Sequence, residues 1–250
     1  MTPKPKSPSR SGSRVANVLN GGSELVFLFD VDNTLFDNDR MQNDLFGHIG
    51  KHFGEEARSR YLEIYEQLRS ELGYADYLGA LERYRLEKLR DPRFLAVSNW
   101  LIGYPFPQRL YPGALDVVKQ ARRWGKAAIL SDGDAVFQPR KVDASGLWKA
   151  FAGNVLIFIH KEQELDCVEH FYPAKHYVMV DDKLRLLQAI KDIWKDRVTT
   201  VFVQQGHYAR DKKAIAQYRP ADFSIRQIGD LLNMKRADLL QTKRAASQGA

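Results

Sequence analysis

The chain has 250 residues, of which 44% are hydrophobic and 28% charged, a composition typical of a soluble globular protein that can bury a core. No apolar run approaches the roughly 20 residues of a membrane-spanning helix, and the N-terminus lacks the apolar segment of a secretory signal. A single cysteine, Cys167, excludes an internal disulfide and agrees with a reducing compartment. We therefore expect a cytoplasmic protein without membrane insertion.

The net charge of +7 belongs to the two ends of the chain. Residues 1–22 carry four basic side chains and no acidic one, and residues 235–250 carry a net charge of +3, so residues 23–234 are neutral overall. The Pro/Ser/Lys mixture at the start cannot bury enough apolar surface to offset its ordering entropy and is predicted to be disordered. We expect two basic tails and no specific nucleic-acid binding.

Apolar runs of strand length recur along the chain. The first is LVFLF at 25–29, and the others lie at 127–130, 155–159, 177–180 and 198–203. Each is nearly continuous, as expected of parallel strands that are covered on both faces. Segments with helical spacing lie between them, such as 114–125, which ends at Gly125. The pattern predicts an α/β fold, a doubly wound parallel sheet of Rossmann-like type, over residues 23–36 and 111–234.

One interval, residues 37–110, has no convincing strand but repeated helical spacing. A loop of that length without structure of its own would be improbable. We predict an α-helical module inserted into the α/β domain, with residues 71–79 as a turn between two of its helices.

Polar residues follow four of the predicted strands, and in open α/β sheets ligands bind outside these strand ends. In chain order they are Asp30, Asp32 and Thr34; Ser131, Asp132 and Asp134; His160 and Lys161; and Asp181, Asp182 and Lys183. Carboxylates this close together are tolerable if a divalent cation neutralises them, and the absence of a Cys/His cluster favours Mg²⁺ over zinc. Asp30 is placed to attack a substrate and Asp32 to transfer protons, while Ser131 and Lys161 are suited to hold a phosphoryl group.

These motifs resemble those of the haloacid dehalogenase superfamily of phosphohydrolases. DVDNTL at 30–35 is similar to its first motif, ILSDGD with Ser131 to its second, Lys161 to its third, and VMVDDK with Asp181 and Asp182 to its fourth. The predicted helical module, 37–110, resembles the cap that the family inserts after the first motif.

The resemblance implies a Mg²⁺-dependent phosphomonoester hydrolase acting on a small phosphorylated metabolite. Asp30 would form an aspartyl-phosphate, and Asp32 would protonate the leaving oxygen and later activate water. Mg²⁺ would bind Asp30, the backbone carbonyl of Asp32 and the acidic pair, with Asp182 favoured over Asp181 for direct contact. Asp32 argues against true dehalogenation, because members with that chemistry lack an acid at this position.

The remaining substrate contacts are predicted around the motifs and in the helical module. Thr34, Asp132 and Gly133 are expected near the phosphate, and Tyr74 and Asp76 in the turn near the rest of the substrate. Lys141 competes with Lys161 for the third motif, but it follows Ser131 by ten residues within a predicted helix, away from a strand end. Lys161 is therefore preferred.

Other functions fit parts of the pattern. Phosphonate cleavage would need a Schiff-base lysine in the module, for which Lys51 and Lys88 are candidates, and phosphoryl transfer would use the same scaffold. A phospho-acceptor signalling domain would show its acidic pair after the first strand, whereas here the pair follows the fourth. A non-catalytic phosphate-binding protein is a further alternative.

Overall fold

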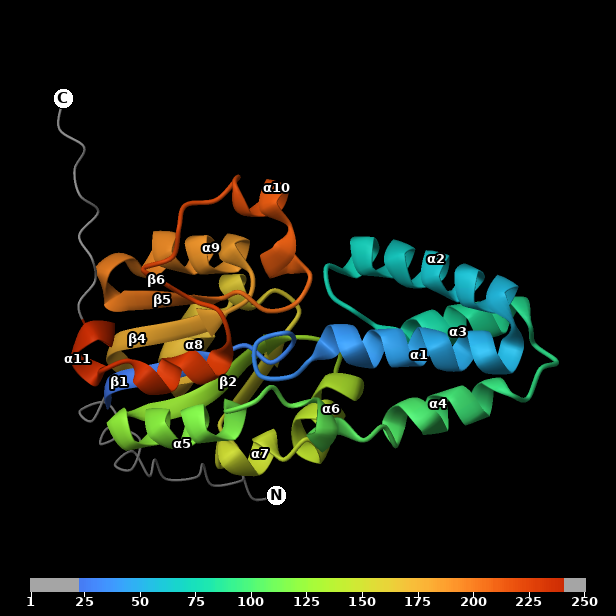
Figure 1. Cartoon of the computed structure of the whole chain (residues 1–250), viewed down its shortest axis with the longest axis horizontal. Coiled ribbons are helices and arrows are strands. Elements are labelled where there is room, and N and C mark those ends of the chain that lie inside the picture. Colours follow the sequence, from blue (N-terminus) through green and yellow to red (C-terminus); the bar gives the residue numbers. More distant parts are fainter. Residues whose placement is uncertain (1–22, 241–250) are drawn as a thin grey trace, which may run out of the picture.

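A computed structural model describes residues 23–240 of the chain. Its strands form one parallel six-stranded sheet in the order β3-β2-β1-β4-β5-β6 (Figure 1). The strands are β1 (Ser23–Phe29), β2 (Lys126–Asp132), β3 (Val155–Phe158), β4 (Ala174–Asp181), β5 (Val198–Val203) and β6 (Phe223–Ile225). The predicted α/β fold with a parallel sheet is confirmed.

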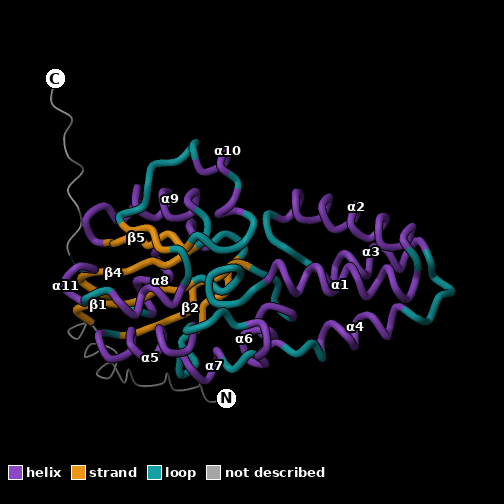
Figure 2. The backbone as a smooth tube through the Cα atoms, viewed as in Figure 1, coloured by secondary structure: helices purple, strands orange, loops and turns teal. Residues whose placement is uncertain are grey.

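Both faces of the sheet are covered, which explains the continuous apolar runs. Successive side chains of β1 point to opposite faces, so Phe27 and Phe29 enter one core while Val26 and Leu28 enter the other. The first core also contains residues of α5 (Ala114–Trp124), α6 (Phe137–Ala144) and α7 (Leu147–Ala150). The second contains residues of α8 (Leu165–Phe171) and α9 (Leu184–Trp194). Figure 2 shows the strands between these helices.

Helices α1 to α4 follow β1 and lie beyond the carboxyl ends of the strands (Figure 1). Their bounds are α1 (Asn38–Phe53), α2 (Glu55–Leu72), α3 (Tyr77–Glu87) and α4 (Phe94–Ile102), and the 3-10 helix η1 (Phe106–Arg109) returns the chain towards the sheet. Between α2 and α3 the chain turns at Gly73, which has a left-handed φ of 81° and ends α2. We refer to residues 38–109 as the helical insertion.

The carboxyl-terminal part of the described chain differs from expectation. β6 has only three residues, too few to form an apolar run of the kind that identified the other strands. Leu239, in α11 (Arg236–Leu239), is fully buried, and its carbonyl accepts a hydrogen bond of 2.8 Å from Thr199 Oγ1. The folded core therefore continues past residue 234, where the second basic tail was predicted to begin. Residues 1–22 and 241–250 of the predicted tails lie outside the described residues.

The shorter elements complete the chain order: η2 (Lys161–Gln163), η3 (Lys195–Arg197), η4 (Tyr208–Arg210), α10 (Lys212–Ile215) and η5 (Ile228–Asn233). Within residues 23–240, no helix combines the length and apolar character needed to cross a membrane.

Candidate active site

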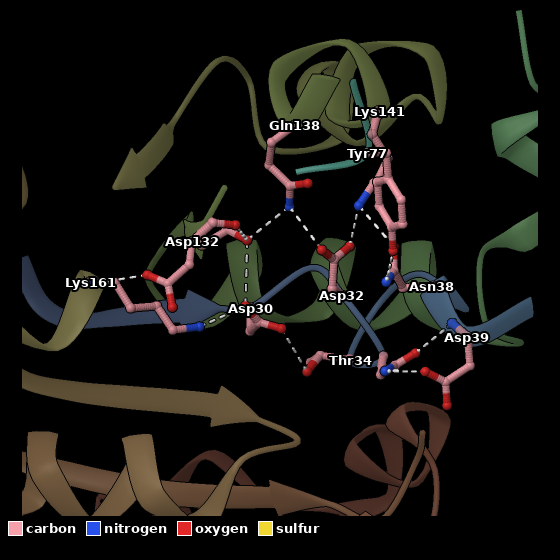
Figure 3. A network of polar contacts seen from close by, with 12 residues as sticks. Asp30, Asp32, Thr34, Asn38, Asp39, Tyr77, Asp132, Gln138, Lys141 and Lys161 are labelled. Atoms are coloured by element: carbon pink, nitrogen blue, oxygen red, sulfur yellow. Dashed lines mark hydrogen bonds and ion pairs between the residues drawn. The ribbon is translucent and has the colours of Figure 1, made fainter. Parts of the chain in front are cut away.

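Asp30 lies directly after β1 and is 3% exposed. The chain then reverses sharply, because the carbonyl of Val31 accepts hydrogen bonds of 2.9 Å from the backbone N–H groups of both Leu35 and Phe36. This turn keeps Asp32 close to the end of the strand. The two carboxylates consequently occupy one edge of the sheet with different surroundings (Figure 3).

Three side chains from separate parts of the chain contact the Asp30 carboxylate. Lys161 Nζ donates a hydrogen bond of 2.6 Å to Oδ1, Thr34 Oγ1 donates one of 3.3 Å to Oδ2, and Ser131 Oγ lies 3.5 Å from Oδ1. Asp132 positions Lys161, since its Oδ1 accepts a hydrogen bond of 2.7 Å from the Lys161 backbone N–H. The structure thus brings together the predicted first, second and third motifs.

Asp30 also belongs to a buried carboxylate cluster. One oxygen each of Asp30, Asp181 and Asp182 fall within 4.8 Å of one another. Asp181 forms an ion pair of 2.6 Å with Lys161, whereas neither carboxylate oxygen of Asp182 has a hydrogen-bond partner in the described chain. Buried carboxylates without partners are costly, and a hard divalent cation is the group that would satisfy them. The donor set therefore fits Mg²⁺, and the free oxygens of Asp182 agree with its predicted direct contact.

Burial and neighbouring charges shift the pKa values of the groups in this cluster. Burial raises the pKa of Asp181 to about 6, although Lys161 opposes the shift, and it raises the pKa of Asp182 well above its usual range. Burial alone would lower the pKa of Lys161, but the carboxylates of Asp181, Asp30 and Asp132 outweigh it and hold the pKa above the ordinary value. The lysine is therefore a permanent positive charge beside the candidate nucleophile.

Asp32 is held apart from the cluster by two residues of α6. Lys141 Nζ donates a hydrogen bond of 2.6 Å to Asp32 Oδ1, and Gln138 Nε2 donates one of 3.4 Å to Oδ2 (Figure 3). The expectation that Lys141 lies away from the strand ends was wrong, because its long side chain spans the distance from the helix to the site. Gln138 was not predicted, and the only sequence signal was its position one helical turn before Lys141.

Gly133 has a packing role. Its backbone N–H donates to the carbonyl of Phe158 at 2.9 Å, so this group is already used and does not support the predicted phosphate contact. A Cβ at this position would lie 2.6 Å from Cβ and Cγ of Gln138. Glycine is thus required by the close approach of Gln138.

A cleft of about 60 Å³ separates the strand ends from the helical insertion. Residues of both parts line it: Asp32, Asn33, Asn38, Gln42, Tyr65, Arg69, Gly73, Tyr74, Ala75, Asp132, Lys183, His207 and Tyr208. A second cavity of about 230 Å³ adjoins it and is lined by four of the same residues, Gly73, Asp132, Lys183 and Tyr208.

The cleft tests the predictions made for the helical insertion. Tyr74 lines it, but Asp76 does not: its Oδ1 accepts a hydrogen bond of 2.7 Å from the Gly79 N–H and caps α3. The predicted substrate contact of Asp76 is therefore corrected to a capping role. Lys51 and Lys88 are exposed and line neither cavity, which leaves phosphonate cleavage without its required lysine.

Comparison with known proteins identifies the wider group. The family model for haloacid dehalogenase-like hydrolases matches residues 25–193. The crystal structure of a protein assigned to these hydrolases, from Burkholderia xenovorans LB400, is 57% identical with a TM-score of 0.82, and the match covers 85% of this chain and 99% of that chain.

More distant structures are similar in fold alone. L-2-haloacid dehalogenase from Xanthobacter autotrophicus is 20% identical with a TM-score of 0.54, and the match covers 83% of this chain and 96% of that chain. YfnB from Bacillus subtilis, a magnesium-bound protein assigned to the HAD-hydrolases, is 14% identical with a TM-score of 0.58, and the match covers 84% of this chain and 97% of that chain. A comparison with curated protein sequences gives no match.

Proposed function

Because the chain belongs to the haloacid dehalogenase-like hydrolases, we propose that it is a Mg²⁺-dependent phosphomonoester hydrolase acting on a small phosphorylated metabolite. The observation that carries the proposal is the buried carboxylate of Asp182, which lacks a hydrogen-bond partner beside Asp30 and Asp181. A phosphoryl group would bring further negative charge to three carboxylates, and the two lysines whose charges act on them, Lys161 and Lys183, do not offset the sum. A site built for phosphate esters therefore needs a cation where Asp182 lies.

The residues that would hold Mg²⁺ are Asp30, Asp181 and Asp182, with the backbone carbonyl of Asp32 as the further predicted ligand. Bound there, the ion supplies positive charge that offsets the negative charge of the phosphoryl oxygens.

In the first half of the reaction, an oxygen of the Asp30 carboxylate attacks phosphorus. The bond from phosphorus to the leaving oxygen breaks, its electron pair stays on that oxygen, and Asp32 supplies the proton that completes the alcohol. Lys161 and Ser131 already contact Asp30 and are suited to bind the oxygens of the transferring group. The products of this half are a free alcohol and an aspartyl-phosphate on Asp30.

In the second half, Asp32 takes a proton from a water molecule, whose oxygen bonds to phosphorus. The bond between phosphorus and the Asp30 oxygen breaks, which restores the carboxylate and releases inorganic phosphate. A halide needs no proton when it leaves, so a proton-transferring acid at position 32 serves a phosphate ester and not a haloacid.

The helical insertion acts as a cap in this proposal. The cleft volume of about 60 Å³ is below the roughly 300–1,000 Å³ of typical ligand pockets, and in this proposal the insertion moves to admit the substrate. The adjoining cavity of about 230 Å³ offers room for the leaving group of a small metabolite.

The test is the Asp30→Asn variant, which removes the nucleophile at nearly constant shape. Wild-type protein is expected to release phosphate from an aryl phosphate only with Mg²⁺, and the variant to lose this activity while keeping its thermal unfolding transition. Wild-type turnover by the variant, after deamidation is excluded by mass spectrometry, would overturn the covalent mechanism. Chloride release from 2-chloropropionate without phosphate release would assign dehalogenation instead, and no turnover of any ester would favour a binding protein.

A further inference from the structure

Lys141 is a buried cation whose ion-pair partner in the described chain is Asp32. The lysine is 1% exposed, and its Nζ donates hydrogen bonds to Asp32 Oδ1 at 2.6 Å and to Asn38 Oδ1 at 3.0 Å. The rings of Phe36 and Phe137 each lie 5.5 Å from Nζ. An ammonium group is costly to bury. Its partner, Asp32, is the carboxylate that gives and takes a proton in the proposed reaction, so the burial of Lys141 at this place needs a reason.

A second donor restrains the other oxygen of the same carboxylate. Gln138 Nε2 donates to Asp32 Oδ2 at 3.4 Å and to Ser131 Oγ at 3.0 Å. Gln138 and Lys141 lie one turn apart on α6, so a single rigid helix presents both donors. With a donor on each oxygen, the carboxylate of Asp32 is fixed in rotation and kept apart from the carboxylate of Asp30.

The donors also distinguish the two oxygens of Asp32. A lysine ammonium donates hydrogen bonds and accepts none, so a proton carried by Asp32 cannot lie between Oδ1 and Nζ. Oδ2 accepts only the longer hydrogen bond of 3.4 Å from the neutral amide of Gln138, so it is the oxygen less engaged by its donor and the better placed to carry the proton. Gln138 Nε2 also donates to Ser131 Oγ, which lies 3.5 Å from Asp30 Oδ1, so a chain of contacts links Oδ2 to the candidate nucleophile.

Residues of the helical insertion hold Lys141 through a chain of hydrogen bonds. Asn38, at the start of α1, donates through Nδ2 to the Tyr77 hydroxyl of α3 at 3.0 Å. Tyr77 is 1% exposed, and its carbonyl accepts a hydrogen bond of 2.9 Å from the Tyr61 hydroxyl. Figure 3 shows the continuous chain of contacts from Tyr77 through Asn38 and Lys141 to Asp32.

From these contacts we propose that Lys141 is a positioning residue, which holds the Asp32 carboxylate with Oδ2 presented to the reacting groups. This inference rests on the proposed function, because it concerns the acid and base of that reaction. Without the lysine, Asp32 would rotate, and the steps in which it gives or takes a proton would slow. Attack by Asp30 on a substrate whose leaving group needs no proton would continue.

The test compares Lys141→Met with the wild-type protein on phosphate esters of graded leaving-group basicity. For an alkyl phosphate, we expect kcat/KM to fall about 10–100-fold, part of the effect of a general acid. For 4-nitrophenyl phosphate, whose phenolate leaves readily, the rate of Asp30 phosphorylation in a pre-steady-state burst should change less than about threefold. The matched control is Lys149→Met, which makes the same change at an exposed lysine of α7 and should alter neither rate.

A double-mutant cycle separates positioning from a merely structural role. If Lys141 acts through Asp32, the Asp32→Asn/Lys141→Met protein should be no slower on the alkyl phosphate than Asp32→Asn alone. Equal losses on every ester, or additive losses in the cycle, would overturn the positioning role. Should Lys141→Met fail to fold, Tyr77→Phe is the second variant. It keeps the buried ring and removes only the hydroxyl that holds Asn38. Its loss of rate should depend on the leaving group in the same way but be smaller. A wild-type protein that hydrolyses no ester would refute the proposed function itself, and with it this inference.

Discussion

The Asp182→Asn variant is expected to stabilise the metal-free protein, the opposite of what most substitutions at a buried position do. Both oxygens of the Asp182 carboxylate lack hydrogen-bond partners in residues 23–240, and the residue is 1% exposed. The amide has nearly the same shape and carries no charge. It therefore removes the cost of burying an ionisable carboxyl beside Asp181 and Asp30, a cost that the charge of Lys183 reduces but does not cancel.

The size of the effect follows from the burial. The amide is itself an unpartnered polar group, so only the electrostatic cost is recovered: about 1.4 kcal/mol for each pH unit by which burial raises the pKa of Asp182, or roughly 3–5 °C in Tm per pH unit for a chain of this size. Wild-type protein should gain about 2.7 kcal/mol from Mg²⁺ at 100 times its Kd, and the variant should lose this gain. Differential scanning fluorimetry with EDTA and with Mg²⁺ measures both quantities.

The matched comparison is Asp181→Asn. The Asp181 carboxylate forms a 2.6 Å ion pair with buried Lys161, so its removal leaves that lysine with fewer anionic partners. The loss of that pair offsets part of what the removal of a buried charge gains, so with EDTA this variant should be stabilised less than Asp182→Asn, in line with an Asp181 pKa that burial raises to about 6 against the opposing charge of Lys161. A destabilised Asp182→Asn protein that still responds to Mg²⁺ would refute the assignment of a cation site at Asp182.

Three further outcomes are expected. Burial raises the pKa of Asp181 to about 6 in the metal-free protein, so the folded state binds more protons than the unfolded state between about pH 4 and pH 6, and its stability falls as pH rises through that window. Mg²⁺ replaces the proton, so the Tm increase caused by Mg²⁺ should be larger at about pH 7 than at about pH 5, and equal increases would contradict the shift. Gly133→Ala should displace Gln138 and lower Tm by about 2–10 °C, with a larger loss of kcat than of substrate binding; unchanged steady-state kinetics would show that the side chain is accommodated. Tyr74→Ala should change the ranking of phosphate esters in a substrate panel, whereas Asp76→Ala should only destabilise α3 by about 1 kcal/mol, and the reverse pattern would return substrate contact to Asp76.

That the polar residues at the strand ends lie together was predictable, because a parallel sheet brings the carboxyl ends of its strands to one edge. Asp30, Ser131 and Asp181 therefore meet once five apolar runs are recognised as strands. Only local pattern is needed for this step. The third apolar run was also sufficient to place Lys161, since this residue lies three positions after the end of β3.

The role of each polar side chain was not predictable, because it depends on partners far away in the sequence. Asp76 and Tyr74 lie two residues apart in one turn, yet one caps a helix and the other lines the cleft. Asp181 and Asp182 are adjacent, yet within residues 23–240 only Asp181 forms an ion pair with a lysine. Sequence spacing does not distinguish such neighbours, since successive side chains point in different directions and meet different elements.

Lys141 shows most clearly what the tertiary structure decided. From the sequence it is one more lysine in an amphipathic helix, and its distance along the chain from any strand argued against a place in the site. The packing of α6 against the turn after β1 places its ammonium 2.6 Å from Asp32, a residue 109 positions away. The apolar pattern of the chain by itself determined the sheet and the edge at which its acids gather. The choice of which cation pairs with which acid arose only when the helices packed, because a buried charge requires a partner in space and not in sequence.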